Sequence, residues 1–351
     1  MRLSETALTV EDLAALVREE DPVLDTILLE PRGGYQTRTV ALDGVLREVT
    51  ECFARGFRNL DPGEFPTLFC AWGKCRVGST ALNNLFGMAG LPSYYQPVKA
   101  IARQRLTERD PAPWLLPSSA AHPYVFIKET AGPYLLAECL FIPLQQLIDA
   151  GYPASKLHLI ILDRQPADSL ASWIDKWSSR APEQILARNY MIAALNVIRV
   201  RNHARRHGVK VTHYVYEASR EPVTAAKALF RRLGLSDRFT DMTVTEWNEK
   251  GQLGSDQAKI IFPEEPDIYT VPGLHWASGD YSFRARRKAP VADAHLALLE
   301  HCGIQDIYRE SVAACARDLG FDFATSARMF GPATQREPLP THRAAPIPQE
   351  A

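Results

Sequence analysis

Residues 67–86 read TLFCAWGKCRVGSTALNNLF, and this stretch decides the fold class. TLFCAWG (67–73) is a short, continuous apolar run, which is typical of a strand covered on both faces. A helical pattern over 80–88 follows it. The loop between them carries Gly73 and Gly78 at the strand–helix corner, where backbone N–H groups and the helix dipole attract an anion. The stretch predicts a strand, a phosphate-cradling loop and a helix.

Three more apolar runs, each followed by a helical pattern, extend this unit along the chain. They are YVFIKE (124–129), KLHLIILDR (156–164) and VKVTHYVYE (209–217). The helical patterns cover residues 135–150, 166–177, 183–206 and 222–233. Strands that alternate with helices predict an α/β fold with a doubly wound parallel sheet flanked by helices. Ligands bind such sheets at the carboxyl ends of the strands, so functional residues are expected just after each run.

The two ends of the chain add helical segments to this core. Thr9 is a plausible N-cap for a helix over VEDLAALVREE, and a second helical pattern runs from Asp43 to Phe57. Helical periodicity returns over 291–330, and the proline-rich residues after it predict a disordered tail. We expect a helical N-terminal extension packed on the core (1–65), a main domain (66–330) and the tail (331–351).

Composition excludes several classes of protein. The 351 residues are 46% hydrophobic and 23% charged, with a formal net charge of −1, which argues against a general nucleic-acid binder. The first residues lack the apolar core of a signal peptide, and no run of about 18 apolar residues predicts a membrane span. The cytoplasm is therefore expected. Six scattered cysteines indicate neither a metal cluster nor a disulfide framework.

The loop departs from the phosphate loop of nucleoside-triphosphate hydrolases and kinases. Its spacing is GxxxxG-Ser-Thr, but Ser79 stands where those proteins carry a lysine against the β- and γ-phosphates. Positive charge lies earlier instead, at Lys74 and Arg76. The loop therefore suits a phosphate-like group and suits ATP poorly.

A second candidate anion site follows the third run, in LIILDRQPADSLASWIDKW (159–177). Arg164 comes just after the predicted strand, and Pro166 and Asp168 suit the first turn of a helix. Ser172 lies two turns into that helix. Trp173 and Trp177 share an apolar stripe, which favours the core over a ligand platform.

Together these residues resemble the sulfotransferase superfamily, whose fold is P-loop-like. Its first motif, basic-x-Gly-[ST]-Thr, matches Arg76 to Thr80. Its second motif is a strand that ends in Arg, then Pro and Asp, with Ser eight residues after the Arg, and the matching residues are Arg164, Pro166, Asp168 and Ser172. A weaker third match is Tyr216-Glu217 followed by a helix that ends at Leu233 to Leu235. The resemblance covers about residues 66–236 in a consistent order.

The resemblance implies 3′-phosphoadenosine-5′-phosphosulfate (PAPS) as the sulfuryl donor, a small-molecule acceptor with a hydroxyl or, less favoured, an amine, and no metal. It implies that Arg76 contacts the transferring sulfuryl group and that Arg164 and Ser172 hold the 3′-phosphate. The 5′-phosphosulfate would lie among the loop residues Lys74, Arg76, Val77, Gly78, Ser79 and Thr80. A monomer or a homodimer is expected. The basic stretch 284–288 is either a lid over the 3′-phosphate or a solvated run of charge.

The base that takes the acceptor proton departs from the family. The cytosolic branch has a histidine in a Lys-x-His pattern, where this chain reads Lys128-Glu129-Thr130. Other branches have a glutamate in the zone that here reads PSYYQPVKA (92–100), with Gln96. Glu129, at the end of a predicted strand, is the first candidate and His122 the second, while Lys128 could assist the leaving oxygen. Glu138 and His275 are more distant candidates.

Two other functions stay open from the sequence. One is an ATP-dependent small-molecule kinase of the P-loop type, for which Asp163 is the nearest candidate metal ligand. The other is a non-catalytic nucleotide-binding protein. Possible aromatic walls for an acceptor are Tyr94, Tyr95, Trp114, Trp276 and Tyr281.

Overall fold

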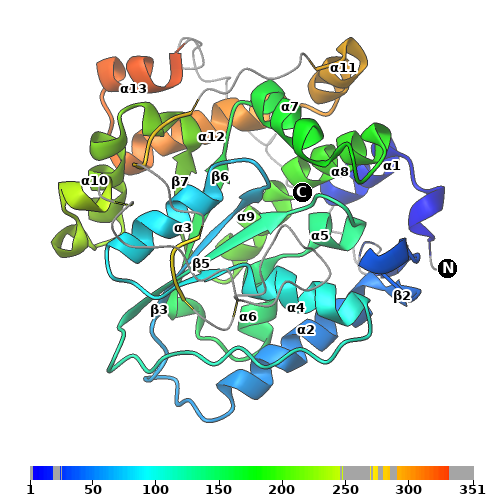
Figure 1. Cartoon of the computed structure of the whole chain (residues 1–351), viewed down its shortest axis with the longest axis horizontal. Helices are drawn as coiled ribbons and strands as arrows, with labels where there is room; N and C mark the ends of the chain where they lie inside the picture. Colours follow the sequence, from blue (N-terminus) through cyan, green and yellow to red (C-terminus); the bar gives the residue numbers. More distant parts are fainter. Residues whose placement is uncertain are drawn as a thin grey trace, which may run out of the picture.

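A five-stranded parallel sheet forms the centre of the molecule (Figure 1). The computed structural model describes residues 3–18, 24, 26–245, 247, 269, 272–275, 280–284 and 291–331. The strand order is β4-β5-β3-β6-β7. The strands are β3 (Thr67–Lys74), β4 (Ser93–Tyr95), β5 (Tyr124–Ala131), β6 (Leu157–Asp163) and β7 (Lys210–Val215). This arrangement confirms the predicted α/β class with a parallel sheet.

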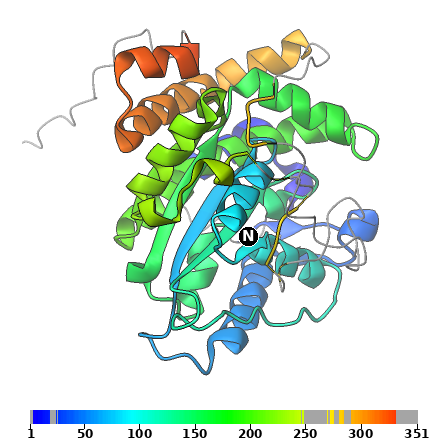
Figure 2. The ribbon, with the colours of Figure 1, turned by 60° about the vertical axis from the view of Figure 1, so that its left-hand side comes forward.

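Helices cover both faces of the sheet, as Figure 2 shows for α10 and α12 on one side and α2 on the other. One face carries α3 (Ser79–Met88), α10 (Pro222–Arg232), α12 (Ile304–Leu319) and α13 (Phe323–Phe330). The other face carries α1 (Val10–Arg18), α2 (Leu42–Phe57), α4 (Pro97–Leu106), α5 (Leu136–Leu140), α6 (Pro143–Asp149), α7 (Pro166–Trp177), α8 (Glu183–Leu195), α9 (Val197–Arg206) and α11 (Asp293–His301). A short ribbon, β1 (Leu28–Leu29) with β2 (Val40–Ala41), lies outside the sheet.

Alternate residues of each central strand face two different cores. In β3, Phe69 and Ala71 pack into the core under α3 and α10, whereas Cys70 and Trp72 pack into the core under α2 and α8. Because both faces are buried, the strand needs apolar residues at nearly every position. This is why its sequence reads as a continuous apolar run.

The helical ends of the chain follow their sequence signals. Thr9 and Asp12 cap α1 reciprocally: the Asp12 N–H donates to Thr9 Oγ1 at 3.1 Å, and the Thr9 N–H donates to Asp12 Oδ2 at 3.0 Å. The predicted second helix is α2. The predicted tail falls on residues outside the described ranges, apart from Gly331, and so do Trp276 and residues 285–288 of the basic stretch.

Two predicted helices are each divided in two. The pattern over 135–150 forms α5 and α6, because Pro143 opens a new helix at its first turn. The pattern over 183–206 forms α8 and α9, which meet at Asn196. The Asn196 side chain donates to the Phe141 carbonyl at 3.0 Å, so a hydrogen bond links the α8–α9 junction to the α5–α6 junction.

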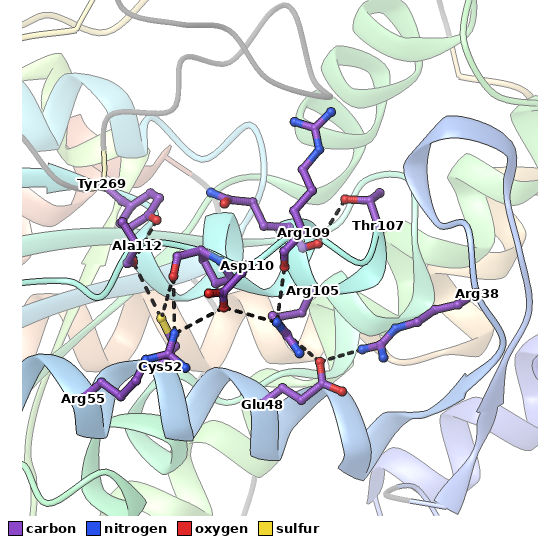
Figure 3. A network of polar contacts seen from close by, with 12 residues as sticks. Arg38, Glu48, Cys52, Arg55, Arg105, Thr107, Arg109, Asp110, Ala112 and Tyr269 are labelled. Atoms are coloured by element: carbon purple, nitrogen blue, oxygen red, sulfur yellow. Dashed lines mark hydrogen bonds and ion pairs between the residues drawn. The ribbon is translucent and has the colours of Figure 1, made fainter.

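Polar contacts join the N-terminal segment to α4 (Figure 3). Glu48 of α2 accepts from Arg38 at 2.6 Å and from Arg105 of α4 at 2.7 Å. Burial raises the pKa of Glu48, but the hydrogen bonds from the two arginines outweigh it and leave the pKa below its ordinary value. Asp110 lies 3.5 Å from both Arg55 and Arg105. These contacts fix α4, which packs beside the site.

The strands that follow β3 in the chain are added first on one side of β3 and then on the other. The chain runs from β3 to the edge strand β4, returns to β5 beside β3, and then crosses to β6 on the other side. The carboxyl end of β3, between β5 and β6, is therefore a topological switch point, where open α/β sheets bind ligands. None of the described helices is long and apolar enough to cross a membrane.

Candidate functional site

The loop after β3 turns sharply into α3. Gly78 is the N-cap of α3 and has a φ of 79°, in the left-handed region that favours glycine. A Cβ atom at Gly78 would lie only 2.3 Å from Cδ2 of Tyr216. Arg76 also has a positive φ, 72°, which is uncommon for a residue with a side chain and is frequent at functional loops. The loop thus combines a glycine in a conformation that suits it with an arginine held in one that it does not favour.

A pocket of about 620 Å³, its open mouth included, lies over this loop. Its walls come from the loop, from the start of α3, from the carboxyl-terminal parts of β4, β5 and α7, and from the residues just after β6 and β7. The lining residues are Cys75, Arg76, Gly78, Ser79, Thr80, Ala81, Tyr95, Lys128, Thr130, Arg164, Lys176, Trp177 and Tyr216. Among these described residues, four are cationic and none is acidic. With the N-terminus of α3 at its floor, the pocket is suited to an anion.

The two anion motifs touch each other beside this pocket, where Ser172 is buried behind the lining, with 1% of its surface exposed. Arg76 Nε donates to Ser172 Oγ of α7 at 2.9 Å. Arg164 Nη1 donates to the Arg76 carbonyl at 3.2 Å. The structure therefore brings Arg76, Arg164 and Ser172 together, although 96 residues separate Arg76 from Ser172 in the chain.

The Tyr216 ring contacts both Arg164 and the loop after β3. The guanidinium of Arg164 lies 4.8 Å from the centre of the Tyr216 ring, which also packs against Gly78. The Arg164 Nε atom is buried without a hydrogen-bond partner. The Arg284 N–H donates to the Tyr216 hydroxyl at 3.1 Å, so the basic stretch starts beside Arg164. Contacts with the Arg76 carbonyl and the Tyr216 ring thus hold the Arg164 guanidinium in place, and its Nε–H group has no hydrogen-bond acceptor.

The turn between β6 and α7 is held by Glu217. The Gln165 N–H donates to Glu217 Oε1 at 3.1 Å, and the Gln165 side chain accepts from the Asp168 N–H at 2.7 Å to cap α7. Burial raises the pKa of Glu217, and the hydrogen bond from Gln165 offsets part of the rise. Glu217 therefore holds the turn between Arg164 and α7, which belongs to the second motif.

Lys74 and Val77 lie outside the pocket lining. Lys74 forms a buried ion pair with Asp163, and its ammonium lies 5.8 Å from the centre of the Tyr190 ring. Burial lowers the pKa of Lys74, but the charge and hydrogen bond of Asp163, together with Tyr190 and Glu217, outweigh this and leave the pKa above its ordinary value. Val77 is buried in the core under α3. The structure does not bring these two side chains to the pocket.

Alternation along β5 separates the residues of the Lys128-Glu129-Thr130 stretch. Lys128 and Thr130 line the pocket, and the Lys128 ammonium lies 3.6 Å from the centre of the Tyr95 ring. Glu129 lies outside the lining and is fully buried against α4. Its carboxylate accepts from the N–H groups of Val98 at 2.7 Å and Lys99 at 3.3 Å.

Glu129 therefore caps the N-terminus of α4. Burial raises its pKa to about 8, although the two backbone hydrogen bonds and the charges of Lys99 and Lys128 lower it in part. His122 is exposed and precedes β5, so it lies at the amino-terminal end of this strand, whereas the pocket lies at the carboxyl-terminal end. Neither candidate base is brought into the pocket.

The remaining acid–base candidates lie outside the pocket lining. Glu138 forms a buried ion pair with Arg103. His275 packs its ring 4.9 Å from that of Tyr95, and burial, followed by the charge of Lys128, lowers its pKa to about 3. Gln96 accepts from the Thr130 hydroxyl.

Several lining residues have only weak signals in the sequence. Lys176 comes four residues after Ser172 and so lies on the same face of α7, a spacing that could have indicated it. Trp177 is in the core, as predicted, with 2% of its surface exposed, and also lines the pocket. Cys75, Ala81 and Thr130 lie beside predicted residues and have no motif of their own.

Comparison with known proteins gives no relative from which a function could be transferred. No protein-family model, no curated protein and no solved structure matches the chain. The function is therefore inferred from the residues and geometry of the pocket.

Proposed function

We propose that the chain is a sulfotransferase that moves the sulfuryl group of PAPS to a hydroxyl, or less favourably an amine, of a small molecule. One observation carries the proposal. The loop after β3 and the turn after β6, which match the two phosphate-binding motifs of the sulfotransferases, are joined by the Arg76–Ser172 and Arg164–Arg76 hydrogen bonds in one cationic pocket.

The donor would lie across both motifs. The 5′-phosphosulfate would bind the backbone N–H groups at the start of α3, with the Ser79 and Thr80 hydroxyls beside it. The 3′-phosphate would bind Arg164, whose planar guanidinium suits a phosphate. Ser172 would support this site while it accepts from Arg76. A second phosphate site of this kind separates PAPS from ATP.

Transfer requires a nucleophile, a leaving group and stabilisation of charge. The acceptor oxygen attacks sulfur, the bond between sulfur and the bridging oxygen breaks, and the electron pair leaves on the 5′-phosphate. Positive groups fixed in advance beside the bridging oxygen would stabilise this charge. Arg76 of the loop and Lys128 of β5 both line the pocket and are assigned this role.

The acceptor proton needs a separate group or water. The proposal gives this role to neither Glu129 nor His122, because both lie outside the pocket lining. His275 contacts Tyr95 of the lining and is the remaining imidazole candidate. Its low pKa keeps it neutral near pH 7, so it is able to accept a proton, although only weakly.

A kinase would use the same region differently. Its metal ligand would be Asp163, but this carboxylate already accepts from the Lys74 ammonium and from the Arg164 N–H at 2.8 Å. Ser79 leaves the helix start without the lysine that binds the β- and γ-phosphates. These contacts favour PAPS over magnesium-ATP.

Transfer from ³⁵S-labelled PAPS to a panel of phenols, aliphatic alcohols and amines tests the proposal. We expect the wild-type chain to label at least one acceptor and Arg76→Ala to lose about a hundredfold or more of that rate. Arg206→Ala, at an exposed arginine of α9, is the matched control and should behave as the wild type. Full activity of Arg76→Ala would refute the site, and donor binding without any transfer would favour a non-catalytic nucleotide-binding protein.

A further inference from the structure

Lys176 is a pocket cation that neither motif accounts for. It lies one turn beyond Ser172 on the same face of α7, and Lys176 lines the pocket, whereas the buried Ser172 contacts the lining residue Arg76. Arg164 precedes this helix, and Ser172 meets Arg76 near its middle. Along α7 the order is therefore Arg164, the Arg76 contact, and then Lys176.

This order separates Lys176 from Arg164, the cation proposed to bind the 3′-phosphate, while Ser172 lies one turn from Lys176. The helix rises about 1.5 Å per residue, so Lys176 lies about 15 Å along the axis from the start of α7, where Arg164 is held. Arg76 stands between the two cations. If Arg76 contacts the transferring group, Lys176 lies on the side of Arg76 that is remote from the donor's 3′-phosphate.

The position of Lys176 is supported by a rigid aromatic wall. Its ammonium lies 5.3 Å from the centre of the Trp177 ring. Trp177 in turn packs edge-on against Trp173 at 5.2 Å and against Tyr134 at 6.1 Å. A lysine that rests on a fixed ring loses less freedom on binding than one that projects into water.

In-line displacement places the acceptor opposite the leaving oxygen, on the side of Arg76 away from the bulk of the donor. Among the four described lining cations, the proposal gives Arg164, Arg76 and Lys128 to the phosphates and sulfuryl group of the donor, and Lys176 is the one to which the donor assigns no role. We infer that the pocket takes an acceptor that bears an anionic group, a carboxylate, sulfonate or phosphate, and that Lys176 binds this group. The inference rests on the proposed sulfotransferase function.

Matched binding probes test the inference whichever acceptor the enzyme uses. The full chain is first saturated with adenosine 3′,5′-bisphosphate, and the affinities of 4-hydroxybenzoate and 4-hydroxybenzamide are then measured by calorimetry. These probes share a ring and a hydroxyl and differ in charge. We expect the carboxylate to bind about fivefold more tightly, and Lys176→Gln to remove this preference.

Two further variants serve as controls. Lys176→Arg should keep the preference because it keeps the charge, and Lys227→Gln, at an exposed lysine of α10, should leave it unchanged. All variants should bind adenosine 3′,5′-bisphosphate as the wild type does. Equal binding of the two probes, absence of carboxylate binding, or a preference that persists in Lys176→Gln would overturn the inference. Failure of adenosine 3′,5′-bisphosphate to bind would instead count against the sulfotransferase function itself.

Discussion

Arg164 has a structural role in the loop and, in the proposed function, a binding role as well. Nη1 anchors the loop through the Arg76 carbonyl, the guanidinium face rests over Tyr216, and Nε is left without a partner. A buried donor without a partner is costly unless a ligand satisfies it. The Nε atom itself is shielded from solvent, so in the proposed function the contact with a phosphate belongs to the part of the Arg164 side chain that lines the pocket.

Replacement of Arg164 should therefore affect the donor more than the chemical step. We expect Arg164→Ala to raise the KM for PAPS by about tenfold to a hundredfold, with a smaller change in kcat, because a charge-assisted hydrogen bond is lost. Arg164→Lys should recover only part of the loss, since lysine lacks the planar fork. Steady-state kinetics with varied PAPS provide the measurement. A fall in kcat alone, at unchanged KM, would move Arg164 out of the donor site.

Among the elements, α4 is attached to the sheet through the buried carboxyl group of Glu129. Glu129 accepts from the first N–H groups of α4, and its pKa of about 8 lies well above its ordinary value of 4.5. Unfolded chains release this proton at a lower pH than the folded protein does. The contribution of Glu129 to stability is therefore fully present below about pH 4.5 and is lost as the pH rises through about 8.

The variant Glu129→Gln should remove this pH dependence. Relative to the wild type, its free energy of unfolding should rise between pH 5 and pH 8, by an amount on the order of 1 kcal/mol or more. Buried histidines shift stability in the opposite direction, but they are common to both proteins and cancel in the difference. Urea unfolding across this range gives the measurement, with Glu300→Gln at an exposed position as control. Parallel stability curves would contradict the raised pKa. We also expect Glu129→Gln to retain transfer activity.

The elements that the sequence predicts best are those that bury two faces. β3, β5 and β6 appear as nearly continuous apolar runs because each contacts both cores, whereas the edge strand β7 is partly exposed and carries polar residues. β4 has only three residues, and α4 begins at Pro97 directly after it, so neither gives a periodic pattern of useful length. The break at Asn196 is equally hidden, since its cause is a hydrogen bond to Phe141, which is 55 residues away.

For the whole molecule, the pocket depends on contacts between distant segments. Arg76, Ser79, Thr80 and Arg164 each lie in a short strand–loop–helix unit, so local spacing is sufficient to predict them. The direction of Glu129 depends instead on which face of β5 meets α4. Spacing along one strand could not decide this.

The donor is the central claim, and ligand-dependent stability of the whole chain tests it most directly. The melting temperature is measured alone, with adenosine 3′,5′-bisphosphate, with adenosine 5′-monophosphate, and with ATP and magnesium. Ligands that bind only the folded state stabilise it, so we expect adenosine 3′,5′-bisphosphate at a hundredfold excess over its Kd to raise the melting temperature by about 5 °C. The monophosphate, which lacks the 3′-phosphate for Arg164, should raise it much less, as should magnesium-ATP. A larger shift with magnesium-ATP than with the bisphosphate would contradict the account.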